Sequence, residues 1–192
     1  MLLDRYRALF RVPAIRATMV ASIPGRLPIG IAGFAILLLV QNKSGSFVTA
    51  GLASALYVAG LASVAPMVGR IIDRAGPLPV LRVCALVYPV MLAALVGLVM
   101  LRAHALAIAL CAYVAGAALP PVTICMRTLY PRVLTDAALL QTAYSVDSVL
   151  VESVFVIGPA LVALFLAAGI PEGAVLLAAL TAGAGTLWFA RT

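Results

Sequence analysis

Residues 78–101 read LPVLRVCALVYPVMLAALVGLVML and contain a single charge, Arg82. About 20 consecutive apolar residues are enough for a helix to cross the hydrocarbon core of a bilayer. The stretch therefore predicts a membrane-spanning helix. Arg82 lies near the beginning of this helix, where its long side chain can reach the membrane surface.

Similar apolar segments fill the rest of the chain. The predicted spans lie near residues 17–40, 47–69, 78–101, 104–126, 139–168 and 172–190. Only 10% of the residues are charged, against about 25% in soluble domains, which excludes a large water-soluble domain. We expect a single all-α transmembrane domain over residues 1–192, with six spans joined by short polar turns.

Basic side chains are distributed unevenly between the two ends of these spans. If the N-terminus lies in the cytoplasm, that side carries Arg5, Arg7, Arg11, Arg16, Arg70, Arg74, Arg127, Arg132 and Arg191. The opposite side then carries Lys43 and Arg102. Because cytoplasmic loops hold an excess of Lys and Arg, the pattern predicts a multi-pass protein of the cell membrane with both termini in the cytoplasm. The net charge of +7 is then a topology signal and indicates no nucleic-acid partner.

Prolines and glycines interrupt three of the predicted spans. The expected helix breaks are at Pro24, Pro28, Pro120, Pro121, Gly158 and Pro159. Breaks at corresponding places in the first and fourth spans are typical of transporters built from two inverted repeats, whose binding sites lie at such breaks. The sequence therefore predicts a three-plus-three inverted repeat. The alternative is that Gly and Pro are simply more frequent in spanning helices.

Three ionisable residues lie inside the apolar segments. Arg26 is ten residues beyond Arg16, which places it about 15 Å deep in a core about 30 Å thick. Asp147 lies at a matching depth of about 16 Å, and Glu152 is about 8 Å deeper. A lone charge at that depth costs at least about 2.5 to 3.5 kcal/mol. We therefore expect Arg26 to meet Asp147 or Glu152.

The fifth predicted span carries a polar stripe. Gln141, Ser145, Ser148 and Glu152 recur at helical spacing, whereas Asp147 projects about 120° away from them. We expect one carboxylate to form a salt bridge and the other to face water, with Ser148 beside it in a transport cavity. The alternative is a polar clamp between helices that has no transport role.

Tyr113 is a further candidate cavity residue, although aromatic residues in spanning helices also pack or lie at interfaces. Small residues that allow close helix contact predict a packing face on the second span. These residues are Gly51, Ala55, Ala59 and Ser63.

The turn after the second span reads GRIIDRAG, from Gly69 to Gly76. This pattern resembles the signature loop of the major facilitator superfamily of secondary transporters. The resemblance implies that Asp73 and Arg74 form a cytoplasmic gating latch. It also implies that the chain corresponds to the N-terminal six-helix half of a transporter that normally has twelve spans. Pro77 and Leu78 depart from the family pattern, which usually has further basic residues there.

The resemblance implies transport of a small-molecule substrate by alternating access, with protons as a candidate coupling ion. A six-span bundle forms one wall of such a site, so a second half or a second copy of the chain is the expected partner. The Gly158-Pro159 dipeptide resembles part of an antiporter motif, but the match stops there. The alternative is a truncated, non-transporting remnant or a helical partner subunit in the membrane.

Catalytic and metal-binding machinery is not expected. The chain has one His, and its three Cys lie within apolar segments. It contains no H-E-x-x-H and no G-x-S-x-G pattern. We expect no enzyme activity, no metal site and no cofactor.

Overall fold

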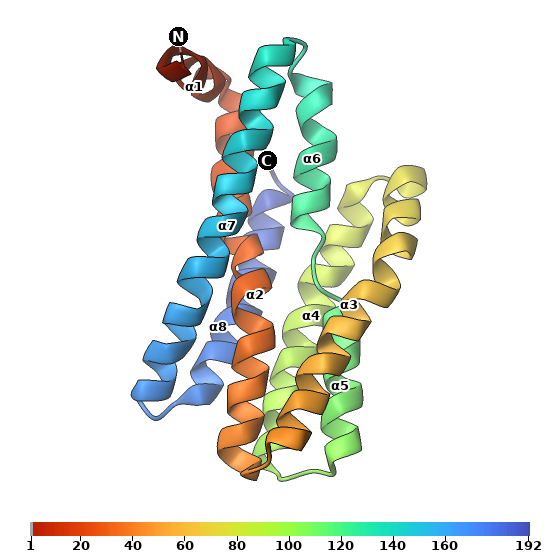
Figure 1. Ribbon diagram of the computed structural model, residues 1–192. Helices are drawn as coiled ribbons and strands as arrows, with labels where there is room; N and C mark the ends of the chain where they lie inside the picture. Colours follow the sequence, from red (N-terminus) through yellow and green to blue (C-terminus); the bar gives the residue numbers. More distant parts are fainter. Residues whose placement is uncertain (1) are drawn as a thin grey trace.

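The computed structural model describes residues 2–192, which form helices and no strand (Figure 1). The helices are α1 (Leu2–Arg11), α2 (Pro13–Ser44), α3 (Phe47–Ala75), α4 (Pro77–Met100), α5 (Ala105–Ala117), α6 (Val122–Val133), α7 (Ala137–Ala167) and α8 (Pro171–Phe189). Six of the described helical segments are long and apolar enough to cross a membrane, with α5 and α6 together forming one of them. The prediction of an all-helical, multi-pass membrane protein is confirmed at this level.

The first, second and fourth spans extend further than their hydropathy indicated, whereas the other three agree with the predicted ranges to within two residues. The first runs over Pro13–Ser44 rather than 17–40, and the fourth ends at Val133 rather than 126. A hydropathy window ends where charged residues begin, whereas the backbone hydrogen bonds of a helix continue through them. Arg127 was assigned to the turn after the fourth span, and this assignment is wrong because Arg127 lies inside α6.

Two of the expected helix breaks are absent. Helix α2 runs continuously through Pro24 and Pro28, and α7 runs continuously through Gly158 and Pro159. A proline removes one backbone donor, but neighbouring helices and small local adjustments can compensate for that loss in a spanning helix. Isolated prolines in these two helices therefore do not end them.

The fourth span is the one that breaks. Helix α5 ends at Ala117 and α6 begins at Val122, with Pro120 and Pro121 in the intervening segment. Two adjacent prolines remove two successive backbone donors, and their rings clash with carbonyls of the preceding turn. In Figure 1 the chain leaves the end of α5 and passes through this non-helical segment before α6 begins.

The helices form a bundle with two sides. Helices α2, α3, α6 and α7 lie on the near side in Figure 1, and α4 and α8 lie behind them. We call the surface formed by α2, α3, α6 and α7 the near face. Helix α2 packs along α8 and α7, α3 packs along α5, and α4 packs along α8.

The flanking helices of the near face are the least covered. Only 17% of the apolar window of α7 and 22% of that of α3 are buried, against 50% for α2. Helix α1, which the hydropathy analysis did not identify, packs at the end of the bundle against α7 and α2, with Leu9 fully buried. Most residues of these two apolar windows are therefore not buried within the bundle.

Two pairs of glycines mark the closest helix crossings. A Cβ on Gly30 of α2 would overlap the Val154 carbonyl of α7, and a Cβ on Gly158 would overlap the Gly30 carbonyl. At the crossing of α3 and α5, a Cβ on Gly60 would overlap the Tyr113 carbonyl, and one on Gly116 would overlap that of Tyr57. The missing side chains allow direct contact between backbones.

The predicted packing face on the second span is wrong. Ala55, Ala59 and Ser63 are exposed on α3, and Gly51 is half-buried with nothing near the position of a Cβ. The face of α3 that packs carries Ala50, Ala53, Tyr57 and Gly60. Small residues occur on both faces of this helix, so their spacing alone could not identify the packed one.

Candidate functional site

A buried cluster of polar side chains joins three spans of the bundle. Arg26 comes from α2, Arg127 and Tyr130 come from α6, and Asp147 comes from α7. We call these four residues the Asp147 cluster. Arg26 is 1% exposed and Asp147 is 0% exposed, so both charges lie inside protein rather than in lipid.

The Asp147 carboxylate accepts three hydrogen bonds. Arg26 Nη2 donates to Oδ1 at 2.5 Å, Tyr130 Oη donates to Oδ1 at 2.9 Å, and Arg127 Nε donates to Oδ2 at 3.1 Å. Buried charges persist in proteins when they are paired and hydrogen-bonded. Both carboxylate oxygens are therefore hydrogen-bonded, and the negative charge is compensated by two guanidinium groups.

Arginine is in excess in this cluster. Two guanidinium groups share one carboxylate, so the cluster carries a formal charge of +1. Nε and Nη1 of Arg26 are buried and have no hydrogen-bond partner within the described part of the chain. Arg127 is 53% exposed on its side chain, so its outer guanidinium edge reaches the surface of the bundle.

The cluster contains two residues that the sequence did not indicate. Arg127 and Tyr130 are three residues apart on α6 and therefore lie on one side of that helix. Tyr144 of α7 packs its ring edge against Tyr130 with the ring centroids 5.6 Å apart. If the fourth span is extended past Arg127, Arg127 and Tyr130 come to lie opposite Asp147. The spacing of three residues between them is the feature of the sequence that could have indicated a shared side of the helix.

Glu152 lies outside the Asp147 cluster. It stands at the midpoint of α7 and is exposed, with Ser148 and Ser153 beside it in a shallow hollow. Its carboxylate forms no ion pair with any side chain of residues 5–192. The four members of the polar stripe are all exposed on α7: Gln141, Ser145, Ser148 and Glu152.

Tyr113 links α5 to α3. Its hydroxyl lies 2.9 Å from Ser63 Oγ, which connects α5 to α3 just beyond the crossing at Gly60. Tyr113 is half-buried and does not contact the Asp147 cluster through a hydrogen bond in the described structure. The structure therefore places it in an interhelical contact at the edge of α3.

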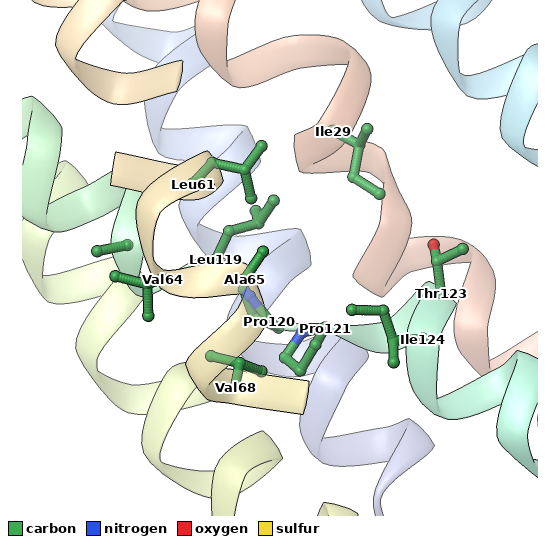
Figure 2. A pocket seen from close by; sticks show the side chains of 11 residues that line it. Ile29, Leu61, Val64, Ala65, Val68, Leu119, Pro120, Pro121, Thr123 and Ile124 are labelled. Atoms are coloured by element: carbon green, nitrogen blue, oxygen red, sulfur yellow. The ribbon is translucent and has the colours of Figure 1, made fainter. Parts of the chain in front are cut away.

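The break in the fourth span lines a hydrophobic pocket of about 180 Å³ (Figure 2). We call it the break pocket. Its walls come from α2, α3, the non-helical segment and the beginning of α6. The lining side chains include Ile29, Leu61, Val68, Pro121, Thr123 and Ile124.

The turn between α3 and α4 is very short. Helix α3 ends at Ala75, and Gly76 with φ of 82° leads directly into α4 at Pro77. Asp73 and Arg74 are exposed. The Asp73 carboxylate, which the resemblance places in a latch, forms no hydrogen bond with the side chains of residues 5–192. Gly69 lies one turn earlier on α3, with nothing near the position of a Cβ.

No known protein family, curated protein or solved structure matches the chain.

The described residues contain no group of three or more His, Cys, Asp or Glu side chains placed to hold a metal ion. Two features of the described structure are unusual for spanning helices. One is the Asp147 cluster with its buried ion pair, and the other is the exposed carboxylate of Glu152 at the middle of α7.

Proposed function

We propose that this chain is one six-helix half of a secondary transporter resembling the major facilitator superfamily. It moves a small solute by alternating access against a second bundle. The observation that carries the proposal is the position of Glu152, an unpaired carboxylate at the middle of a membrane-spanning helix. A charge at that depth requires water or a protein partner, because acyl chains cannot solvate it.

The near face has a second feature that is incompatible with lipid. The fourth span breaks midway between Ala105 and Val133. Non-helical backbone at membrane depth is tolerated where it is buried in protein or lines a cavity, and is not found against lipid. Glu152 and the break lie on helices of the same face, which supports a water-filled path between this face and a second bundle.

The helix pairing supports an inverted repeat of spans one to three and four to six. In such a repeat the first and fourth spans correspond, as do the second and fifth. The crossing of α2 with α7 would then be equivalent to the crossing of α5 with α3. Each of these crossings has a pair of glycines at its closest point, Gly30 with Gly158 and Gly116 with Gly60.

The second bundle would cover α3 and α7, the two least buried spans. It would be a separately encoded chain or a second copy of this one. The unpaired Asp73 and the adjacent Arg74 would then form the cytoplasmic latch by contacting that partner. In this arrangement both termini and α1, with Arg5, Arg7 and Arg11, lie at the cytoplasmic surface of the cell membrane.

Transport is tested on the protein purified from its own membranes in mild detergent, together with any chain that accompanies it. The preparation is reconstituted into proteoliposomes and offered sugars, amino acids, organic anions and apolar dyes, with and without a proton gradient. We expect uptake of at least one solute by the wild type and by Arg102→Ala, which changes an exposed turn residue. We expect no uptake by Arg26→Ala, because this change removes the charge that holds α2 to α7.

Native mass spectrometry of the same preparation gives the oligomeric state. A folded monomer that takes up none of these solutes overturns the proposal and favours a helical subunit without transport activity. Equal uptake by Arg26→Ala and the wild type also contradicts the role given to the Asp147 cluster.

A further inference from the structure

The break pocket differs from the rest of the near face in its chemistry. In Figure 2 the side chains of Leu61, Val64 and Val68 on α3 lie on one side, with Ile29 on α2 and Ile124 on α6 across from them. None of the four residues of the Asp147 cluster lines it. A solute in this pocket would meet aliphatic walls and no charged side chain.

The non-helical segment of the fourth span contributes Leu119, Pro120 and Pro121 to the wall of the break pocket. Its polar backbone groups bond mainly within the chain: Leu119 N–H donates to the Gly116 carbonyl, and the Pro120 and Pro121 carbonyls accept from Val122 and Cys125. The wall is therefore apolar, and in the proposed transporter the opening of the pocket faces the second bundle.

One lining side chain offers a directional contact. Thr123 stands at the beginning of α6, and its Oγ1 is buried with no hydrogen-bond partner within the described structure. Because Oγ1 is buried, it reaches a ligand in the pocket only after the Thr123 side chain rotates, and the new hydrogen bond would recover the free energy that the unpaired hydroxyl costs. The remaining lining side chains are aliphatic or proline.

We propose that the break pocket binds the transported solute, and that this solute is a small apolar molecule with one hydrogen-bonding group directed at Thr123. This inference rests on the proposed transport function and names its substrate class. Ligand sites of this kind are mostly hydrophobic with few polar contacts that fix orientation. Sugars and zwitterions fit poorly, because their many polar groups would lose water without gaining partners.

Binding is tested with N-phenyl-1-naphthylamine, an apolar fluorescent amine with one N–H group, on the purified complex in detergent. We expect saturable binding that Ala65→Trp abolishes, because Ala65 lines the pocket and the larger side chain fills it. Ala94→Trp is the matched control, since Ala94 is exposed on α4 and lines none of the pockets described. We expect Thr123→Val to weaken binding about three- to tenfold, the effect of one lost hydrogen bond.

The thermal unfolding midpoint of each variant shows whether it is folded, so that lost binding can be assigned to the pocket. Equal binding by folded Ala65→Trp and the wild type overturns the inference. Displacement of the probe by lysophospholipid, but not by small apolar solutes, makes the pocket a lipid site and also overturns it.

The same variants separate this inference from the proposed function. Uptake of a polar solute that is unchanged by Ala65→Trp contradicts the apolar substrate class and leaves transport standing. Probe binding that depends on Ala65 and Thr123, in a protein that moves no solute, contradicts transport and leaves the pocket as a ligand site.

Discussion

Asp147 forms more polar contacts than any other member of the Asp147 cluster. The burial of its two arginine partners determines how much each substitution in the cluster lowers stability. The carboxylate is fully buried and pairs with Arg26, which is also buried, and with Arg127, which is half-exposed. Removing one partner of a buried pair leaves an uncompensated charge, whereas removing a partly exposed partner lets water replace it. The two arginines should therefore differ in their contribution to stability.

We expect Asp147→Asn to lower the free energy of unfolding by about 3 to 5 kcal/mol, because the buried Arg26 guanidinium loses its counter-charge. Arg127→Gln should cost about 1 kcal/mol or less, because that side chain can be solvated. Unfolding in detergent, followed by circular dichroism, measures both. Equal costs for the two variants would contradict the burial difference on which this prediction depends.

Depth along the spans was enough to predict the pairing of Arg26 with the fifth span. It left Asp147 and Glu152 as alternatives, and the structure selects Asp147. Arg127 and Tyr130 could not be predicted, because the charge of Arg127 ended the hydropathy segment before these residues were reached. A charge that looks like a loop residue in a sequence can lie within a helix and pair with a buried carboxylate of the opposite helix, as Arg127 does with Asp147.

At the scale of helices, glycines set the distance between spans. Gly60 and Gly116 allow α3 and α5 to touch through their backbones, as Gly30 and Gly158 do for α2 and α7. A methyl group at any of these positions would have to displace a carbonyl of the neighbouring helix. On α3 itself, the same substitution at Gly51 or Gly69 meets open space.

Gly60→Ala and Gly51→Ala test this directly, because both glycines lie in α3 and only Gly60 faces another backbone. We expect Gly60→Ala to destabilise the bundle by about 1 to 3 kcal/mol, the cost of overpacking. Gly51→Ala should be neutral or stabilising by up to about 1 kcal/mol, because alanine favours the helix. Thermal unfolding of both variants is the measurement, and a stable Gly60→Ala would show that the crossing is looser than described.

The sequence predicted the number of spans well and their internal geometry less well. Apolar length identified all six spans, since that property depends on composition alone. The prolines of the first, fourth and fifth spans were all expected to interrupt their helices. Only the adjacent pair Pro120 and Pro121 does so. Whether a single proline ends a spanning helix depends on neighbours that can compensate its missing donor, which one sequence does not display.

At the scale of the whole bundle, its polar features occur on α7 and at the break in the fourth span. Glu152 and the other members of the polar stripe are exposed on α7, and the fourth span is interrupted between α5 and α6. Apolar side chains are exposed on both sides of the bundle: Val149 and Val156 lie beside Glu152 on α7, and Leu86 and Val90 are exposed on α4. The polar stripe of α7 is therefore the surface on which the proposed partner and solute path can be tested.

The most direct test of a water-accessible near face is the reaction of single cysteines with a charged thiol reagent in native membranes. The background is a variant in which Cys84, Cys111 and Cys125 are replaced by alanine. Ser148→Cys on α7 is compared with Leu86→Cys on α4, since both residues are exposed and lie within their spans, about 14 to 17 Å from the beginning of their own helices. The reagent is a trimethylammonium methanethiosulfonate, which reacts with thiolates in water. The account predicts modification of Ser148→Cys at least about tenfold faster than Leu86→Cys, and equally slow modification of both would contradict it.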